Sequence, residues 1–409
     1  MSYEYVKPLA IGRAWLENYR SLYGQSVFEM DRAIAATPKH ADQIDLTHGD
    51  TRAFVPPDSA FKDFTKAVKD NTEAYSAYRG SSTVRELIAP RISKLLSVEV
   101  DPMSELIITP GSQGALFSAL SAFVGPGTIV AFPSVEYFMN ERIVSYLGGQ
   151  SIRIPAKINS DGYIEIDEQE LEAAHKSGAS VLVFSNPNNP TGGIYSREVC
   201  QKLANWAKKY DISVIADQLY CRLIYDKRDY TNIASLPGMK NQTITLLGPS
   251  KTESMSGYRV GVALAQSQII NSMESILSMT SLRTAGYAQH ALTHWLAEED
   301  GWLEERILQH QEIRDYLVQG LATIPGISIF KPGGSSYIFP SMSETTSING
   351  NNYENDFIFT QDLKKAGILV SPGYQSGIAG RGHFRINFSQ NFELIKTSVA
   401  RIQKLVKND

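Results

Sequence analysis

Short apolar runs, separated by stretches with helical spacing, constrain the fold of this chain more than any other feature. The runs are ELIIT, TIVAF, SVLVFS, ISVIAD, TITLLG and RVGVALA, at residues 105–109, 128–132, 180–185, 212–217, 243–248 and 259–265. They are almost continuously apolar, which is typical of strands buried on both faces. Strands of this kind alternating with helices predict an α/β domain with a mostly parallel sheet.

The patterns on either side of this region predict the rest of the organisation. Helical spacing is clear at residues 61–70 and 82–96, and residues 286–323 have the pattern of a long helical stretch. Strand candidates set among helices follow after residue 325. We expect an N-terminal helical arm and covering segment at 1–55 that belongs with the small domain, a large α/β domain at 56–325, and a small C-terminal α+β domain at 326–409.

The composition excludes several classes of protein. Of the 409 residues, 43% are hydrophobic and 20% are charged, with a formal net charge of -4. This mildly acidic balance gives no electrostatic case for nucleic acid or an anionic membrane surface. We find neither a signal peptide nor an apolar run long enough to span a bilayer. The two cysteines, Cys200 and Cys221, make no disulfide framework, so we expect a cytoplasmic globular protein.

The loop SNPNNPTGG, at residues 185–193, follows one of the apolar runs directly. Pro187 and Pro190 restrict its backbone while Gly192 and Gly193 allow tight turning, so Asn189 would stand on a rigid support at a strand end. Ligands of such sheets bind at the carboxyl ends of the strands. An ordinary turn is the alternative interpretation.

Two further strand ends carry charged residues. Asp217 ends the run VIAD, where an acid is costly to bury unless a positive group pairs with it, although a helix N-cap is the alternative. In the segment LLGPSK, Lys251 follows another strand. A desolvated lysine can form a Schiff base, and Ser250 with Arg259 would suit a phosphate. The alternative is a solvated lysine in a polar loop.

Two more segments have anion-binding chemistry. The small-residue turn TPGSQG, at residues 109–114, opens a helix whose free N–H groups and dipole would form an anion site. Arg385 lies in an alternating strand with Phe384 and Phe388. Such an arginine would hold a carboxylate through two hydrogen bonds or pair with a structural acid.

In their order and spacing these segments together resemble the fold-type-I pyridoxal-phosphate enzymes, the aspartate aminotransferase superfamily. The resemblance runs over most of the chain and implies that family's fold, pyridoxal 5'-phosphate as cofactor, and a homodimer with shared active sites. The family's early Y….G…LR pattern is matched at Tyr75, Gly80, Val84 and Arg85. The residue matched by Tyr75 reaches the neighbouring subunit's cofactor phosphate.

The resemblance also assigns the cofactor ligands. It matches five positions to the phosphate ligands: Ser112, Gln113, Gly114, Ser250 and Arg259. Tyr137 matches the aromatic residue that stacks on the pyridine ring, and Asp217 matches the aspartate on the pyridine nitrogen. Asn189 and Tyr220 match the residues on the cofactor's 3-oxygen.

The remaining matches concern the substrate, which the resemblance implies is a small-molecule amino acid. Lys251 matches the Schiff-base lysine, which would also be the general base for the Cα proton. Arg385 matches the arginine that holds the substrate α-carboxylate, and Asn189 lies in the same substrate-binding set. The presence of Lys251 argues against a catalytically inactive, aminotransferase-like binding protein.

The segment IDLTHGDTRAF, at residues 44–54, departs from ordinary aminotransferases. They usually carry an apolar or small residue before the glycine matched by Gly49, in a segment that lies over the substrate, whereas this chain has His48, which can move protons at neutral pH. The segment is similar to that of the O2-dependent pyridoxal-phosphate L-arginine oxidases. In those enzymes a histidine here is linked to oxidation, and an N-terminal helical acid, matched by Glu17, binds the guanidinium group.

This similarity leads to the expected activity, the O2-dependent oxidation of L-arginine to a dehydro or hydroxy 2-oxo or 2-imino acid. A conventional class I/II aminotransferase, acting on an amino acid and a 2-oxo acid, is the alternative. His48 would then be a loop histidine bonded to backbone. Elsewhere, His290, His294 and Glu298 share one helical face, but three ligands along a straight helix cannot surround an ion, so we expect no metal site.

Overall fold

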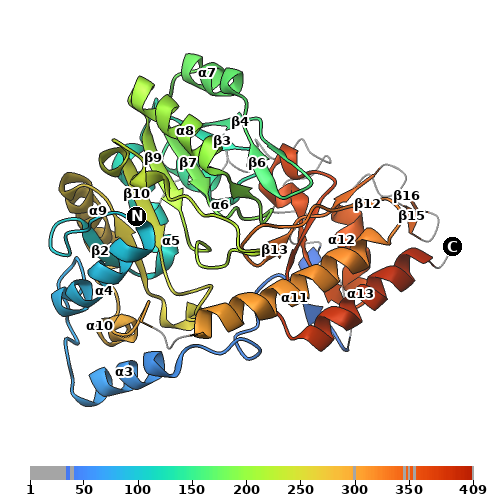
Figure 1. The fold of residues 1–409 in the computed structure, drawn as a ribbon, viewed down its shortest axis with the longest axis horizontal. Helices are drawn as coiled ribbons and strands as arrows, with labels where there is room; N and C mark the ends of the chain where they lie inside the picture. Colours follow the sequence, from blue (N-terminus) through green and yellow to red (C-terminus); the bar gives the residue numbers. More distant parts are fainter. Residues whose placement is uncertain are drawn as a thin grey trace, which may run out of the picture.

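The computed structural model describes residues 34–36, 41–297, 301–343, 347–348, 351–352 and 356–407. A seven-stranded sheet forms its centre, in the order β2-β11-β10-β9-β7-β3-β4. The strands are β2 (Leu106–Thr109), β3 (Ile129–Pro133), β4 (Gln150–Ile154), β7 (Ala179–Ser185), β9 (Ser213–Asp217), β10 (Thr243–Leu247) and β11 (Gly261–Leu264). Only β11 pairs antiparallel with its neighbours in this sheet, so the prediction of a mostly parallel sheet is confirmed. In Figure 1, β9, β7 and β3 lie side by side.

Helices on both faces explain why the strands are apolar throughout. On one face Val181 and Val183 pack in the cluster that contains α5 (Gly111–Phe123) and α9 (Ser267–Thr280). On the other, Leu182 and Phe184 pack with α7 (Glu168–Lys176) and α8 (Arg197–Tyr210). Successive strand residues point to opposite faces, so both sets must be apolar. Each such side chain contributes roughly 1.5–3 kcal/mol on burial.

A serine side chain caps the start of two of the flanking helices, and one predicted helical stretch is broken. The hydroxyl of Ser81 accepts a hydrogen bond from the N–H of Val84 at the start of α4 (Ser82–Leu96), which follows α3 (Asp58–Lys69). Residues 286–323 do not form one long helix. They form α10 (Gly286–Gln289), η4 (His290–Leu292) and α11 (Trp302–Ala322). Leu296 (φ 64°) and Gly301 (φ 89°) have left-handed backbones, which a continuous helix cannot include.

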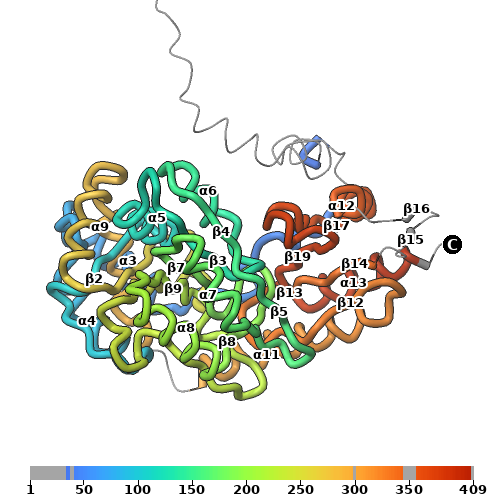
Figure 2. The backbone as a smooth tube through the Cα atoms, turned by 90° about the horizontal axis from the view of Figure 1, so that it is seen from above, coloured from blue at the N-terminus to red at the C-terminus, as the bar shows by residue number. Residues whose placement is uncertain are grey.

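The C-terminal part of the chain forms small sheets and helices beside the main sheet (Figure 2). The strands there are β12 (Ile327–Ser328), β13 (Tyr337–Ile338), β14 (Ser341–Met342), β17 (Ile368–Leu369), β18 (Ser371–Pro372) and β19 (Phe384–Asn387), and the helices are α12 (Asp356–Lys365) and α13 (Phe392–Lys407). β1 (Ile44–Asp45) pairs with β17, although the two strands lie far apart in the sequence. Ile44, Leu46 and Phe54 also join the hydrophobic cluster of α11 and α13. This packing supports the proposed division at residues 55 and 325, which stays a prediction.

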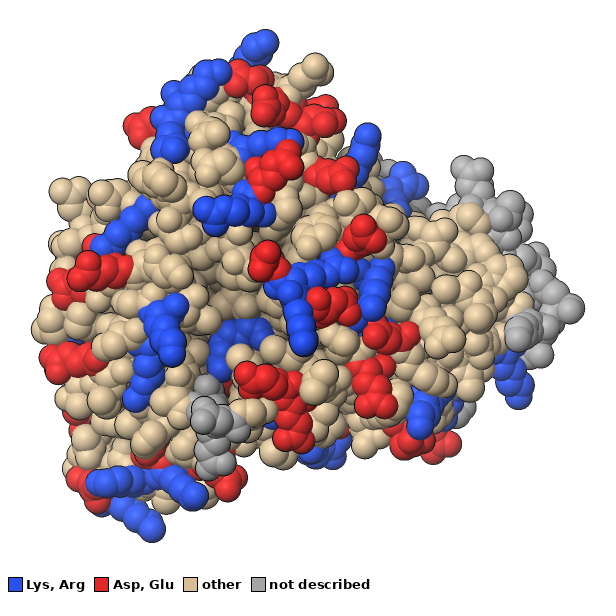
Figure 3. All heavy atoms as spheres, in the orientation of Figure 1, with Lys and Arg blue, Asp and Glu red and all other residues tan. Residues whose placement is uncertain are grey.

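The remaining described α-helix and strands are short. They are α6 (Met139–Tyr146), β5 (Lys157–Ile158), β6 (Tyr163–Glu165), β8 (Ile194–Tyr195), β15 (Ser347–Ile348) and β16 (Asn351–Asn352). Among the described helices, none combines the length and apolar character needed to cross a membrane. On the face seen in Figure 3, positive and negative side chains are interspersed rather than gathered by sign.

Candidate active site

Strand register brings the predicted site segments to one edge of the main sheet. Ser185 at the end of β7 pairs with Asp217 at the end of β9, and Asp217 pairs with Leu246 in β10. The N–H of Asn186 donates to the Asp217 carbonyl over 2.9 Å. The loops that leave these strands therefore open at the same place, the carboxyl edge of the parallel strands.

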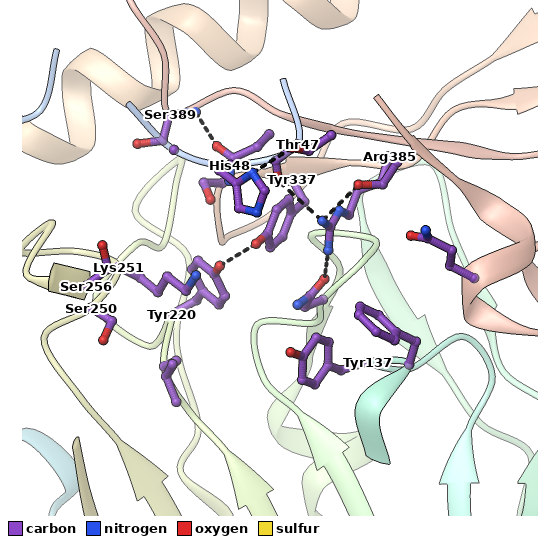
Figure 4. A pocket seen from close by; sticks show the side chains of 18 of the residues that line it. Thr47, His48, Tyr137, Tyr220, Ser250, Lys251, Ser256, Tyr337, Arg385 and Ser389 are labelled. Atoms are coloured by element: carbon purple, nitrogen blue, oxygen red, sulfur yellow. Dashed lines mark hydrogen bonds between the residues drawn. The ribbon is translucent and has the colours of Figure 1, made fainter. Parts of the chain in front are cut away.

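A cavity of about 730 Å³ lies at this edge, between the main sheet and the C-terminal elements. Twelve of the predicted residues line it: His48, Gly49, Ser112, Gln113, Tyr137, Asn189, Asp217, Tyr220, Ser250, Lys251, Arg259 and Arg385. In Figure 4, Lys251 and Arg385 approach the same space from opposite sides, with Tyr220 and Tyr337 between them. Segments far apart in the sequence thus form one pocket.

The SNPNNPTGG loop is held by its own amide side chains. The Asn188 Oδ1 accepts hydrogen bonds from the N–H and hydroxyl of Thr191, and its Nδ2 donates to Ser185 Oγ over 3.1 Å. Ser185 Oγ also accepts from the N–H of Asn189 over 3.1 Å. The loop is therefore rigid because its amides replace the backbone ladder that ends at Ser185.

Glu136 braces this loop from behind, and sequence reasoning did not single it out. Its carboxyl group accepts from the N–H groups of Tyr137 (2.8 Å) and Ser185 (2.9 Å), from the Ser185 hydroxyl (2.5 Å) and from Asn188 Nδ2 (3.2 Å). Burial raises the pKa of Glu136 to about 8, against the opposing effect of these donors. Glu136 thereby ties the backbone of Tyr137 to the loop that carries Asn189.

Arg385 is held in place before any ligand binds. Its Nη1 donates to Asn189 Oδ1 over 2.9 Å, and its Nη2 donates to Ser371 Oγ over 3.1 Å and the Thr47 carbonyl over 3.4 Å. Its guanidinium carbon lies 4.4 Å from the ring centre of Tyr337. The Nε group is buried and has no hydrogen-bond partner within the described residues. Such a fixed, partly unsatisfied guanidinium suits a carboxylate.

Asp217 lines the pocket at the end of β9. Burial raises its pKa to about 6, while the N–H of Leu219, which donates over 3.1 Å, and the charge of Lys251 act in the opposite direction. A positive group placed against Asp217 would keep the carboxylate ionised. This supports the paired-acid interpretation over the N-cap alternative, because β9 runs into a turn at this point and not into a helix.

The loop after β10 carries Lys251 into the pocket on a buried support. Glu253 forms an ion pair with Arg222, and both side chains are almost fully buried. Ser250 is also buried, and within the described part of the chain its hydroxyl has no hydrogen-bond partner. A buried hydroxyl without a partner is costly unless a ligand satisfies it.

A corner of the pocket combines Arg259 with the start of α5. The N-terminus of this 13-residue helix has no side-chain cap, so its first N–H groups are available to an anion. Gly111 (φ 73°) lies so near Arg259 that a Cβ atom there would be 2.5 Å from Nη2. Arg259 Nη1 donates to the Ser256 carbonyl over 2.9 Å. The corner therefore has the donors of a phosphate site.

His48 and Gly49 form part of the pocket wall. Thr47 donates its hydroxyl proton to Asp45 over 2.5 Å, and Thr47 Oγ1 lies 2.6 Å from His48 Nδ1. Because Thr47 has one hydroxyl proton, Nδ1 must be the donor to Thr47, which leaves Nε2 able to accept a proton. The His48 side chain is 86% exposed. The His48 ring is therefore accessible, and it is bonded to a side chain and not to backbone, as a plain loop histidine was expected to be.

Several predicted positions lie outside this pocket. Gly114 does not line it but faces a neighbouring hollow on α5, and its expected place in the phosphate turn stays a prediction. Tyr75 is 82% exposed, so its expected contact with a second subunit stays a prediction. Arg85 is buried and donates to the Pro102 carbonyl, and Gly80 and Val84 are also buried away from the pocket. Glu17 lies outside the described residues.

The histidines of the weak metal pattern are paired with acids. His290 lies 3.4 Å from Glu73 and His294 lies 2.6 Å from Asp63, while Glu298 is not among the described residues. Within the described ranges no group of three metal-ligating side chains was found.

Tyr337 and Lys364 also line the pocket and had no signal in the sequence. Tyr337 lies in a two-residue strand, too short for a period, and Lys364 lies in the last turn of α12. Lys364 Nζ donates to the carbonyls of Ile34 and Ala35 and so fixes the described piece of the N-terminal segment at the pocket.

Comparison with known proteins agrees with this fold. Residues 41–402 match the model of the family described as aminotransferase class I and II. The chain is 29% identical to an aspartate aminotransferase of Pyrococcus abyssi, covering 85% of this chain and 87% of the relative. It is 28% identical to aromatic-amino-acid aminotransferase 2 of Thermococcus litoralis, with the same coverage. The solved structure of an aspartate aminotransferase from Rhodobacter sphaeroides has 37% identity, a TM-score of 0.84, and coverage of 93% of this chain and 99% of that chain.

The sheet and the pocket define a fold-type-I pyridoxal-phosphate-dependent transferase fold. The chain belongs to the aminotransferase class I and II family, and it is a pyridoxal-phosphate-dependent enzyme. The pocket fits this cofactor on its own evidence. The unpartnered Ser250 hydroxyl, the Arg259 guanidinium and the open N-terminus of α5 suit the phosphate, while Asp217 suits a cationic ring nitrogen.

Proposed function

We propose that this protein catalyses transamination between a free L-amino acid and a 2-oxo acid. The observation that carries the proposal is the presence in one pocket of Lys251 and a prepositioned Arg385. An amino acid held by its α-carboxylate at Arg385 would present its α-amino group and Cα toward Lys251. The three relatives named above are all aminotransferases, which supports this reaction.

Five residues would hold the cofactor's ring. Tyr137 would stack on it, Asp217 would face its nitrogen, Asn189 and Tyr220 would donate to its 3-oxygen, and Lys251 would bind it covalently. Asn189 uses Oδ1 for Arg385, so Nδ2 is the donor that remains for that oxygen. The phosphate ligands would be Ser112, Gln113, Ser250 and Arg259, with Gly114 beside them and Tyr75 from a second copy of the chain.

Proton movement at the substrate Cα would be the task of Lys251. When bound, pyridoxal phosphate withdraws electrons from Cα of the attached amino acid, so that a bond at Cα can break. Once the substrate amino group has replaced it, the Nζ of Lys251 would be free to take the Cα proton and to give a proton back later in the reaction. Arg385 would fix the orientation of the substrate during this transfer.

A second candidate function, the O2-dependent oxidation of L-arginine, is favoured by His48. Its Nε2 is free to accept a proton, and the residue lines the pocket that holds Lys251 and Gly49. In this reaction O2 would be the oxidant of the substrate, and His48 would assist later proton or water steps. Glu17 would bind the guanidinium group.

One experiment separates these candidates. The holoenzyme is mixed with a panel of L-amino acids that includes arginine, aspartate and phenylalanine, with and without 2-oxoglutarate. Oxygen, ammonia and newly formed glutamate are followed together. Transamination predicts glutamate formation that needs 2-oxoglutarate and leaves oxygen unchanged.

Oxygen consumption with arginine alone would overturn this conclusion in favour of oxidation, and it should then fall in His48→Ala. Absence of both signals across the panel would overturn both candidates.

We also propose a homodimer and a cytoplasmic location. The exposed Tyr75, with Arg283 5.2 Å from its ring centre, supports a surface prepared for a second copy. Two free, buried cysteines support a reducing compartment.

A further inference from the structure

Tyr337 forms a hydrogen-bonded pair with Tyr220 at the centre of the pocket. The Tyr220 hydroxyl donates to the Tyr337 hydroxyl over 2.9 Å, and the rings meet edge-to-face with centres 5.5 Å apart. Both side chains are 4% exposed. Figure 4 shows this bond on the side of the pocket that Lys251 faces. The hydroxyl that would serve the cofactor's 3-oxygen is therefore already engaged by a second tyrosine.

The ring of Tyr337 also packs against Arg385, the arginine that would bind the substrate. The guanidinium carbon of Arg385 lies 4.4 Å from its centre, within the range of a cation–π interaction. The strands fix this arrangement, because Tyr337 pairs with Asn387 across β13 and β19, two positions from Arg385. Tyr337 thus contacts both Tyr220, which would serve the cofactor, and Arg385, which would bind the substrate.

The charges around Tyr337 act strongly on its hydroxyl. Burial would raise its pKa, but the positive charges of Lys251 and Arg385, with hydrogen bonds from Tyr220 and Asn387, lower the pKa to about 8. Burial and Tyr337 itself raise the pKa of Tyr220. The other titratable groups that line the pocket are His48, Asp50, Tyr137, Asp217, Arg259 and Lys364. The positive charges of Lys251 and Arg385 therefore act on the Tyr337 hydroxyl in addition to its hydrogen bond with Tyr220.

We propose that Tyr337 is a positioning residue that acts through Tyr220 and couples it to Arg385. When Tyr220 turns its proton to the cofactor's 3-oxygen, Tyr337 rotates its hydroxyl and donates to Tyr220, so both protons stay on their own oxygens. A hydrogen bond donated to the Tyr220 hydroxyl strengthens the hydrogen bond that this hydroxyl donates to the 3-oxygen. The inference rests on the proposed role of Tyr220.

The test is a pH titration of the visible absorbance of the bound cofactor. Loss of a hydrogen-bond donor leaves more negative charge on the 3-oxygen, which favours the protonated form of the bound cofactor. The apparent pKa of the absorbance change therefore rises. Tyr220→Phe should raise it most, and Tyr337→Phe should raise it by about half a pH unit. The double variant should show less than the sum of the two shifts.

Tyr225→Phe is the matched control. Tyr225 is equally buried, lies under Arg314 at 4.7 Å, and donates to the Ser335 carbonyl, but it does not line the pocket. It should leave the apparent pKa unchanged. A second readout is the change in this apparent pKa when succinate, a carboxylate without an amino group, binds to the native holoenzyme. The change should be smaller in Tyr337→Phe, because the ring that packs on Arg385 then has no hydroxyl to hydrogen-bond with Tyr220.

The outcomes separate the inference from the proposed function. A shift in Tyr220→Phe with none in Tyr337→Phe, or equal shifts in Tyr337→Phe and Tyr225→Phe, overturns the inference alone. No shift in Tyr220→Phe overturns its assigned place at the 3-oxygen and the inference with it.

Discussion

Arg385 Nη1 lies 2.9 Å from Asn189 Oδ1, so a strand of the C-terminal part and a loop of the main sheet share one hydrogen bond. The bond fixes both groups at once. It turns the amide so that Nδ2 remains for another acceptor, and it holds the guanidinium while Nε stays without a partner among the described residues. A carboxylate arriving at Arg385 meets a group that needs little further ordering, which favours binding.

Replacing Arg385 with lysine tests the carboxylate site. Lysine keeps the charge but cannot make the paired hydrogen bonds of a guanidinium. We expect kcat/KM for the preferred amino acid to fall by about 100-fold, since charge-assisted hydrogen bonds are each worth about 1.5–3 kcal/mol. Steady-state kinetics measure this, and the cofactor absorbance should be unchanged. An unaltered kcat/KM would show that the carboxylate binds elsewhere.

Replacing Lys251 with alanine tests the covalent attachment of the cofactor. The variant has no amine in the pocket at this position, so the visible absorbance of the lysine-bound cofactor should disappear. Mass spectrometry after borohydride reduction should find the label on the native protein at Lys251 and none on the variant. Lys240→Ala, on an exposed lysine paired with Glu105, is the control and should keep both signals. A band that survives in the Lys251 variant would rule out this lysine.

Gly111→Ala tests the phosphate corner. The added Cβ would lie 2.5 Å from Arg259 Nη2 and must displace it. Gly127→Ala is a matched control, because its φ of 90° is also left-handed but nothing lies within 4 Å of its Cβ. Both variants should lose about 1 kcal/mol of stability from backbone strain. Only Gly111→Ala should weaken cofactor binding, by at least about 10-fold, as measured by titration of the apoprotein. Equal affinities in the two variants would exclude Arg259 as a phosphate ligand.

Glu136→Leu tests the brace behind the SNPNNPTGG loop. Leucine nearly preserves the volume but removes both acceptor oxygens, which leaves the buried N–H groups of Ser185 and Tyr137 without partners. Each such loss costs about 1–3 kcal/mol, so the free energy of unfolding should fall by at least about 2 kcal/mol. Glu198→Leu, at an exposed position of α8, should change it by less than about 0.5 kcal/mol. Urea denaturation measures both, and similar values would show that the brace has no energetic role.

How much of this site the sequence could predict depends on where each residue lies. Asn189, Asp217 and Lys251 follow apolar strands, and parallel strands end at one edge, so their meeting could be expected. Tyr337 could not, because its strand is two residues long and its partner Tyr220 lies far away in the sequence. The break at Leu296 in the predicted helical stretch was missed because a leucine rarely adopts a left-handed backbone and gives no warning of one.

His310 links the pH dependence of stability to the segment around Gly49. Its Nδ1 donates to the Arg306 carbonyl over 2.8 Å, and its Nε2 accepts from Ser389, which packs on Gly49. This places a neutral imidazole under Phe54, whose ring centre lies 4.0 Å away. Burial lowers the pKa of His310 to about 4, from an ordinary value of 6.5.

The unfolded chain therefore binds more protons than the native protein between pH 6.5 and 4, so stability is present above pH 6.5 and is lost as the pH falls through this window. His310→Gln keeps hydrogen-bonding capacity but does not titrate. Between pH 7.5 and pH 5 the native protein should lose about 2 kcal/mol more unfolding free energy than the variant does. Burial also lowers the pKa of His383, but that effect is common to both proteins and cancels in the comparison. Denaturation curves at the two pH values provide the measurement, and parallel losses would mean that His310 binds its proton equally well in the native and the unfolded state.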